Sequence, residues 1–318
     1  MNPVLETTRW VIEQAKHVKI HQAKIEEFCG YFEKSHISHW IKHGPYDLNQ
    51  LNDQDQLHFL LVFNSISFSY WGEPKWAVDY HGEKFDGSWA MIAALGKAIE
   101  NKTPVLKMKW LSTLTKNEFE KITKGNVKIP LWKERATILK EVGSMVMQKY
   151  QGDFSRVITE AHGDAIKLLN LIITTFPSFN DTSSYKGKTI YFYKRAQLLV
   201  SDIYQTFNGS NYGDLKNIDQ ITACADYKLP WILRRLGILS YSPALARKVD
   251  NNIEIPHGHE EEIEIRASTI WANEFIKQRL KKSIPTINSI HINDHLWLLS
   301  QVKSVHDKPY HLTRTTTY

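Results

Sequence analysis

Cysteine is almost absent from this sequence, whose 318 residues include only Cys29 and Cys224. Two cysteines cannot build a disulfide framework, and the chain has no CxxC pair that would offer two thiolates to a metal. We therefore expect neither a thiolate zinc site nor an iron–sulfur cluster. So little cysteine is typical of proteins in a reducing compartment, and we expect a cytoplasmic location.

Long hydrophobic runs and blocks of like charge are missing as well. No window of about 18 apolar residues occurs, so we expect no membrane-spanning segment. The polar N-terminal stretch has no apolar signal core. Lys and Arg number 40 against 34 Asp and Glu, and the resulting net charge of +6 is spread along the chain. This charge permits an anionic partner without requiring nucleic acid.

Three motifs that mark common enzyme classes are also absent. The sequence has no GxSxG elbow, no P-loop and no GxGxxG fingerprint. It therefore gives no reason to expect a serine nucleophile, an NTPase or a dinucleotide enzyme.

Aromatic residues, in contrast, are abundant: the chain has 10 Trp, 14 Tyr and 13 Phe. With 42% hydrophobic and 23% charged residues the composition is that of a globular protein, which excludes disorder or a coiled coil for the whole chain. No repeat and no Pro/Gly-rich linker divides the sequence. We expect one domain over residues 1–318, with rings to spare for a flat ligand.

The hydrophobic pattern predicts a mainly α fold with one small β element. Residues 75–87 read as a hairpin with its turn at His81-Gly82, and residues 64–71 as a strand or extended segment. Thr7-Thr8 and Ser88 are expected to cap helices, and a break is expected before Pro230. Helices are predicted in the first 60 residues and at 88–100, 131–150, 155–176, 188–207, 217–239 (two short pieces), 266–282 and 287–303.

Two adjacent cations, Lys194 and Arg195, stand in the segment FYKRAQ (192–197). The apolar stripe of the predicted helix places Lys194 away from the core and Arg195 on its flank. The commoner interpretation is a solvated cationic face. The alternative is an anion clamp, because a lysine point charge beside an arginine fork suits a phosphate.

Asp226 stands at the predicted corner between two short helices, in ACADYKLP (223–230). A carboxylate at such a corner either caps the following helix or serves as a catalytic base or cation stabiliser at a pocket. Tyr227 either stacks on a base or packs in the core. The residues alone leave both pairs of alternatives open.

Two histidine groups have the spacing of metal ligands. His36, His39 and His43 would share one face of a helix, and His257 and His259 alternate ahead of three glutamates. No HExxH-type carboxylate motif accompanies the first group, and the second stands in a polar turn. We therefore expect no metal at either place.

Several segments together resemble the queuosine salvage family, whose members hydrolyse queuosine 5′-monophosphate to release the base queuine. The resemblance extends over nearly the whole chain and follows the family's order. It implies a mostly helical fold similar to helix–hairpin–helix DNA glycosylases, and an N-glycosidase for a small-molecule nucleotide, without metal or cofactor. The matching segments are SFSYW (67–71), DGSWAMIAAL (86–95), IPLWKERATIL (129–139), FPSFND (176–181), FYKRAQLLVSDIY (192–204), ITACADYKLPWILRRLGIL (221–239), EIEIRASTIW (262–271) and INSI…LW (287–297).

The resemblance also implies roles for individual residues. Asp226 in ADY matches the family's catalytic aspartate, and Tyr227 follows it as in the family. Lys194 matches an active-site lysine that we assign to the phosphate end, with Arg195 beside it. The remaining expected substrate contacts are His43, near the family's ligand-contacting histidine, and Asn293 and Asp294 at the base edge.

The sequence departs from the family's pattern at three places. Cys224 stands where the family usually has Phe, and Ser67 where it often has Asn. Residues 293–298 read NDHLWL instead of an acidic-aromatic run. These changes concern the base that is accepted more than the reaction. They leave two alternatives, a nucleic-acid glycosylase and a non-catalytic binder of such nucleotides. The sequence predicts no oligomeric state.

Overall fold

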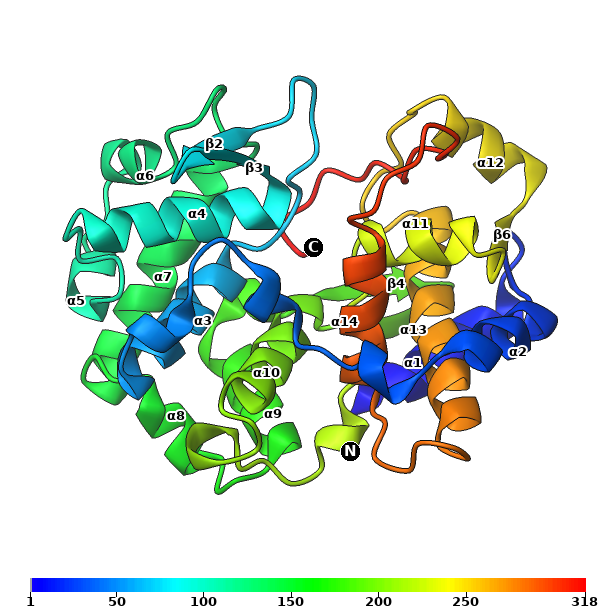
Figure 1. Cartoon of the computed structure of the whole chain (residues 1–318), viewed down its shortest axis with the longest axis horizontal. Coiled ribbons are helices and arrows are strands. Elements are labelled where there is room, and N and C mark those ends of the chain that lie inside the picture. The colour runs from blue at the N-terminus through cyan, green and yellow to red at the C-terminus, as the bar shows by residue number, and fades with distance from the viewer. Residues whose placement is uncertain (1) are drawn as a thin grey trace.

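The computed structural model describes residues 2–318 and is mainly helical (Figure 1). Its longest helix, α13 (Glu260–Leu280), is buried along most of its length. The other α-helices are α1 (Pro3–Gln14), α2 (Gln22–Tyr31), α3 (Asp53–Ser65), α4 (Gly87–Glu100), α5 (Met108–Leu111), α6 (Lys116–Ile122), α7 (Trp132–Tyr150), α8 (Ser155–Glu160), α9 (Ala165–Thr175), α10 (Lys194–Thr206), α11 (Lys228–Arg235), α12 (Pro243–Asp250) and α14 (Ser289–Leu299).

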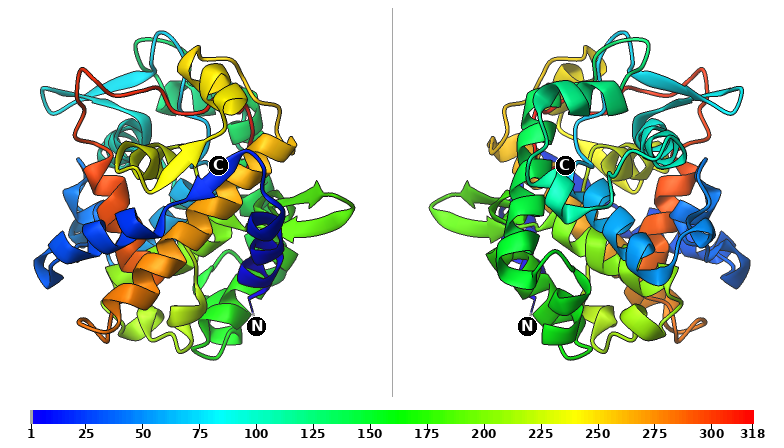
Figure 2. Two further views of the ribbon diagram at one scale, coloured as in Figure 1. Left: turned by 90° about the vertical axis from the view of Figure 1, so that its right-hand side faces the viewer. Right: turned by 90° about the vertical axis from the view of Figure 1, so that its left-hand side faces the viewer.

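The strands form three antiparallel pairs in the described residues, where the sequence predicted one small element. β2 (Ala77–Tyr80) and β3 (Glu83–Asp86) make the expected hairpin at His81-Gly82. β4 (Thr182–Tyr185) and β5 (Lys188–Tyr191) make a second hairpin, which projects from the body in both views of Figure 2. β1 (Val18–Ile20) pairs with β6 (Leu239–Tyr241) and so joins distant parts of the chain.

The described residues form three hydrophobic clusters: a small one of Trp71, Tyr227 and Tyr318, and two extensive ones. The larger of the two extensive clusters is built mainly from α3, α4, α7, α9 and α10. The other extensive cluster is built from α2, α11 and α12 together with parts of α13 and α14. Figure 1 shows the corresponding groups of helices on the left and the right, with the end of the chain between them. The candidate site described below lies where the two groups meet.

Several predicted helix boundaries are wrong, for local reasons. α1 begins at Pro3 with Asn2 as its cap, not at Thr7-Thr8, because Pro at the first position needs no N–H partner. Asp86, not Ser88, precedes α4. The helix break expected directly before Pro230 is absent, because Pro230 is the third residue of α11. It lies in the first turn, where a backbone N–H has no partner within the helix anyway.

Two predicted helices are interrupted. The helix expected at 155–176 is divided by His162 and Gly163, which both have positive φ, and Asp164 caps the second piece, α9. The helix expected at 188–207 begins as strand β5, because the turn at Lys186-Gly187, again with positive φ, returns the chain as a hairpin. The helices predicted at 88–100, 131–150, 266–282 and 287–303 are present in α4, α7, α13 and α14.

The strand or extended segment predicted at 64–71 is not present: residues 64 and 65 end α3, and residues 66–71 form an irregular loop in which Ser69 has a positive φ. This loop is held by other parts of the chain, in particular the C-terminal residues 313–318. No helix in the described part of the chain is long and apolar enough to cross a membrane.

Candidate functional site

A pocket opens where α4, α10, α11 and α14 approach one another, and it holds about 650 Å³ of open space, its mouth included. Its lining joins segments that are distant in sequence: Trp40, Ser67, Phe68, Tyr70, Asp86, Gly87, Ser88, Lys194, Leu198, Cys224, Asp226, Tyr227, Lys228, Leu229, Asn293, Trp297, Gln301 and Tyr318.

Asp226 presents one carboxylate oxygen to the following helix and keeps the other for the pocket. Its Oδ1 accepts hydrogen bonds from the backbone N–H of Lys228, at 2.8 Å, and of Leu229, at 3.0 Å. Its Oδ2 has no hydrogen-bond partner among the described residues and is not among the buried atoms that lack one. The capping interpretation of Asp226 is therefore confirmed, and its second carboxylate oxygen is left accessible to the pocket. The catalytic interpretation stays a prediction.

Lys194 lines the same pocket, only 5% exposed. Its Nζ donates a hydrogen bond to the carbonyl oxygen of Ser67 at 3.2 Å. Burial lowers the pKa of Lys194, while the nearby carboxylate of Asp226 opposes that shift. The expected solvated face is therefore wrong, because α10 is surrounded by other elements and its first residues point into the molecule.

Arg195 is also buried, but its side chain lies behind the pocket wall and does not face the cavity. Its guanidinium donates to the carbonyl oxygens of Ser65 and Ser178 and lies over the rings of Phe68 and Phe179, at 5.2 and 4.9 Å. Burial lowers its pKa to about 10. Arg195 is not part of the pocket lining. Its hydrogen bond to the Ser65 carbonyl instead holds the segment before Ser67 in place.

Arg135 of α7 supports the same segment from another side. Its guanidinium donates to the carbonyl oxygens of Ile66, Phe68 and Ser69 and is fully buried. Because two arginines engage the backbone carbonyls of 65–69, this irregular segment keeps a fixed shape without strand partners. The Ser67 carbonyl that receives Lys194 is therefore held in position.

One side of the pocket is aromatic. Trp40, which begins the 3-10 helix η2 (Trp40–His43), and Trp297 of α14 lie with their ring centres 4.9 Å apart, and both line the cavity. Asn293 lines it nearby. Its Oδ1 accepts the N–H of Cys224 at 2.9 Å and its Nδ2 donates to Asp294 at 3.2 Å, so one amide N–H is left over.

Two buried carboxylates stand behind this aromatic side. Asp202 accepts from His39 Nε2, Trp40 Nε1 and Asn64 Nδ2, at 3.2, 2.9 and 2.8 Å. Asp294 accepts hydrogen bonds from the backbone N–H of Trp40 at 3.3 Å and from Gln205 Nε2 at 2.9 Å. Burial raises the pKa of Asp294 to about 6. The two carboxylates thus fix Trp40 and Asn293 from behind.

The mouth of the pocket carries Lys228 beside Asp86, Gly87 and Ser88 at the start of α4. Lys75 and Lys303 approach Asp86 from outside the lining, with Nζ–Oδ2 distances of 3.9 and 3.6 Å. Burial, together with repulsion from Lys75 and Lys303, lowers the pKa of Lys228 to about 8. The mouth is therefore a site of positive charge.

The structure brings together four of the seven residues expected at the site. Asp226, Lys194, Tyr227 and Asn293 all line the pocket. Arg195 and Asp294 lie behind its wall. His43 lies away from it, exposed, with its Nε2 at 2.8 Å from the hydroxyl of Ser38.

The histidine groups considered for metal binding do not converge. His36 stacks on His295 with ring centres 4.8 Å apart, whereas His39 binds Asp202. His257 lies 3.7 Å from Glu262, and His259 accepts the N–H of Glu261 at the start of α13. Each ring therefore has a separate structural partner.

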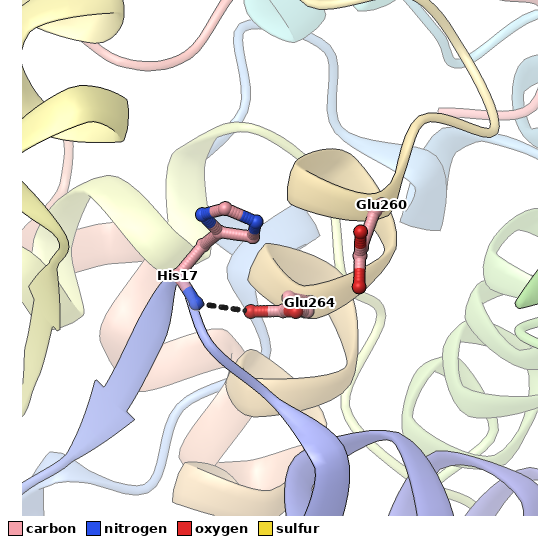
Figure 3. A group of neighbouring side chains, drawn as sticks. All are labelled: His17, Glu260 and Glu264. Atoms are coloured by element: carbon pink, nitrogen blue, oxygen red, sulfur yellow. Dashed lines mark hydrogen bonds between the residues drawn. The ribbon is translucent and has the colours of Figure 1, made fainter. Parts of the chain in front are cut away.

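A different group of possible metal ligands, His17, Glu260 and Glu264, lies away from the pocket (Figure 3). Glu264 is fully buried and accepts the backbone N–H groups of residues 16, 17 and 18 and the hydroxyl of Tyr185. Four donors already satisfy this carboxylate. Its evident role is to fix the turn between α1 and β1 against α13.

Sequence reasoning missed Trp40, Lys228 and the start of α4 as parts of the site. Trp40 stands in a segment interpreted as helix, and only its contact with Asp202 reveals that it turns inward. Lys228 carried a usable signal, because it is two residues from Asp226 in ADYK. The start of α4 stands in DGSWAMIAAL (86–95), a segment that resembles the family, but no role for it was inferred, since its place depends on the packing of the β2–β3 hairpin.

Comparison with known proteins gives one consistent result. The family model described as queuosine salvage protein matches residues 48–318. A protein of Sphaerobacter thermophilus named queuosine 5′-phosphate N-glycosylase/hydrolase is 37% identical, covering 99% of this chain and 97% of that protein. Proteins of the same name from Mus musculus and Bos taurus are 32% and 33% identical, covering 98% and 84% of this chain and 98% and 82% of theirs. The chain belongs to the queuosine salvage protein family.

Proposed function

We propose that this protein hydrolyses the N-glycosidic bond of queuosine 5′-monophosphate. Water adds its hydroxyl to the anomeric carbon, its proton goes to the base nitrogen, and the products are queuine and ribose 5-phosphate. The family membership and the names of the relatives support this reaction. The base is then free for salvage into tRNA modification.

The observation that carries the proposal is the way Asp226 is held. The bond breaks with positive charge developing on the sugar, as in glycoside hydrolysis. Because two N–H groups fix Oδ1, Oδ2 is presented without rotating, and a preorganised charge stabilises the sugar cation more than a mobile one. The same oxygen is positioned to take a proton from the attacking water.

We assign Lys194 and Tyr227 to the sugar beside Asp226. Lys194 is within electrostatic reach of Asp226, and Nζ retains two further N–H donors after its bond to Ser67. Tyr227 packs on Tyr310 with ring centres 4.9 Å apart, which fixes its ring in the pocket wall. These contacts hold the anomeric carbon close to Oδ2.

We assign the aromatic side to the base. Trp40 and Trp297 offer ring surface, and the remaining amide N–H of Asn293 offers a hydrogen bond to the base edge. Cys224, in place of the family's usual Phe, leaves more room on this side. Asp294 and Arg195 do not line the pocket, and they position the substrate only by fixing the residues that do. His43 does not line the pocket, so we assign it no contact with the substrate.

The test is a chromatographic assay for free base from queuosine 5′-monophosphate, with queuosine in parallel. We expect release from the monophosphate and a lower rate on the nucleoside. Tight binding without release would favour the non-catalytic binder. Affinity for nucleic acid that falls steeply with salt would favour a polymer glycosylase.

Three coarser expectations belong to the same proposal. We propose that residues 1–318 act as one domain, since the pocket takes residues from helices of both groups, α4 and α10 of one and α11 and α14 of the other. We propose that the helical fold is related to that of helix–hairpin–helix DNA glycosylases, supported by the catalytic aspartate at the start of a short helix. A cytoplasmic location suits its two free cysteines.

A further inference from the structure

Three lysines and two carboxylates lie at this end of the pocket. Asp86 Oδ2 lies 3.9 Å from Lys75 Nζ and 3.6 Å from Lys303 Nζ. Lys228 lines the pocket with Asp86 and Asp226, and Lys75 and Lys303 are close enough for their charges to disfavour its own. The lysines outnumber the carboxylates, so positive charge is in excess here, and an anionic ligand would neutralise it.

The start of α4 adds hydrogen-bond donors to the same place. Gly87 and Ser88 line the pocket, and Asp86 accepts no hydrogen bond from the first turn. In the described residues the N–H groups of Gly87 and Ser88 have no acceptor. Unpaired N–H groups at a helix start suit a phosphate, but here they supplement the lysines and do not define the site alone.

Lys228 connects this mouth to Asp226. Its backbone N–H holds Asp226 Oδ1, while its Nζ lies over the rings of Trp231 and Tyr310, at 5.4 and 5.9 Å. The side chain is thus directed by packing and not by an ion pair, because no carboxylate lies within 4 Å of its Nζ in the described residues. It is a lysine without an anionic partner at a cavity.

We propose that Lys228, with the first turn of α4, binds the 5′-phosphate of the substrate, and that Lys194 stays at the sugar. The inference rests on the proposed function for its substrate, but its chemistry requires only a phosphate monoester attached to ribose. Lys194 is deep, bonded to Ser67 and close to Asp226. A phosphate dianion is more easily accommodated at the mouth, where Lys75 and Lys303 remain partly in solvent.

The first test is a binding measurement that needs no turnover. Ribose 5-phosphate and ribose are titrated into the wild type and Lys228→Met by calorimetry. Methionine keeps the packing on Trp231 and Tyr310 but removes the charge. We expect ribose 5-phosphate affinity to fall at least about tenfold in the variant, since a charge-assisted contact is lost. Lys97→Met, in the last turn of the same helix α4 and exposed, should retain wild-type affinity.

The second test compares kcat/KM for queuosine 5′-monophosphate with kcat/KM for queuosine. Lys228→Met should reduce the ratio of the two at least about tenfold, and Lys194→Met should lower both together. A larger selective loss in Lys194→Met, or an unchanged ratio in Lys228→Met, overturns the inference. If the wild type hydrolyses neither compound, the proposed function fails, and the ribose 5-phosphate titration still decides the phosphate site.

Discussion

The two oxygens of Asp226 have different surroundings, and this difference separates its structural role from its chemical one. Oδ1 accepts the N–H groups of Lys228 and Leu229, which fixes both the carboxylate and the start of α11. Oδ2 has no such partner. A substitution that preserves one oxygen and removes the charge therefore tests the chemistry without undoing the fold.

We expect Asp226→Asn to bind queuosine 5′-monophosphate while losing turnover. The amide oxygen can still accept the two N–H groups, but no negative charge faces the sugar, and removing one preorganised group costs about 10²–10³-fold or more in rate. Single-turnover release of base and equilibrium binding of the nucleotide check this. Retained hydrolysis would remove Asp226 from the mechanism. Asp226→Ala, which also loses the cap, should be less stable by about 1 kcal/mol.

Lys228 also predicts a pH dependence. Its pKa is lowered to about 8 by burial and by Lys75 and Lys303, while Asp86 and Asp226 act in the opposite direction. Below that pH the ammonium is charged and phosphate binding is complete, and above it the charge is lost. We expect KM for the monophosphate to rise above about pH 8 while KM for the nucleoside does not. Lys228→Met should abolish the difference, and an unaltered profile in that variant would contradict it.

At the scale of elements, the pocket depends on an irregular segment that belongs to no sheet. Residues 65–69 are held by the guanidinium groups of Arg135 and Arg195, which donate to their carbonyl oxygens. Buried carbonyl groups left without donors destabilise a fold. These arginines therefore stabilise the site without touching a ligand.

We expect Arg195→Met to lower the free energy of unfolding by on the order of 3 kcal/mol, as measured by urea denaturation. The substitution leaves the carbonyl groups of Ser65 and Ser178 unpaired in the interior. Arg247→Met on α12, where the side chain is exposed, is the matched control and should change little. A loss of less than about 0.5 kcal/mol in Arg195→Met would show that the segment is held by other contacts.

Two helical glycines give opposite predictions for the same substitution. A Cβ on Gly143 of α7 would lie 2.6 Å from both Leu111 Cβ and Ser112 N, so α5 and α7 would have to separate. Nothing lies within 4 Å of a Cβ on Gly30 of α2. We expect Gly143→Ala to destabilise by about 1–3 kcal/mol and Gly30→Ala to stabilise by up to about 1 kcal/mol. Thermal and urea unfolding of the two variants provide the measurement, and equal shifts would be evidence against the close packing.

The fold was predictable where one apolar stripe defined a helix, as in α7 and α9. It was not predictable where burial is complete. The Lys194–Ile203 part of α10 is buried on all sides, so its stripe indicated a solvent face that does not exist. Asp226 was identified by its place in the sequence together with the family resemblance. Trp40 was not identified, because the residue that orients it, Asp202, is 162 positions away in the sequence.

At the scale of the whole molecule, residues 313–318 complete the site, while the first residues of the chain are fixed elsewhere. Ser69, which has a positive φ of 33°, donates its N–H to the carbonyl of Tyr318 at 2.8 Å and its hydroxyl to that of Thr315 at 2.7 Å. Tyr318 lines the pocket. Near the other end, Glu264 fixes residues 16–18, and β1 pairs with β6.

We expect removal of residues 313–318 to abolish turnover and to reduce stability, because Ser69 and the pocket wall lose their partners. Circular dichroism during thermal unfolding and the base-release assay would record both effects. Tyr318→Phe, which keeps the backbone bond and the ring over Arg266, should remain folded. Full turnover in the shortened chain would show that the wall forms without this segment.

The contact between Ser69 and Tyr318 has a consequence for protein synthesis. A ribosome makes the segment 65–69 long before residues 313–318, which complete its surroundings. Until residues 313–318 have left the exit tunnel, the growing chain has no complete pocket. The nascent protein should therefore acquire its activity only once this segment has emerged, however early the first helices form.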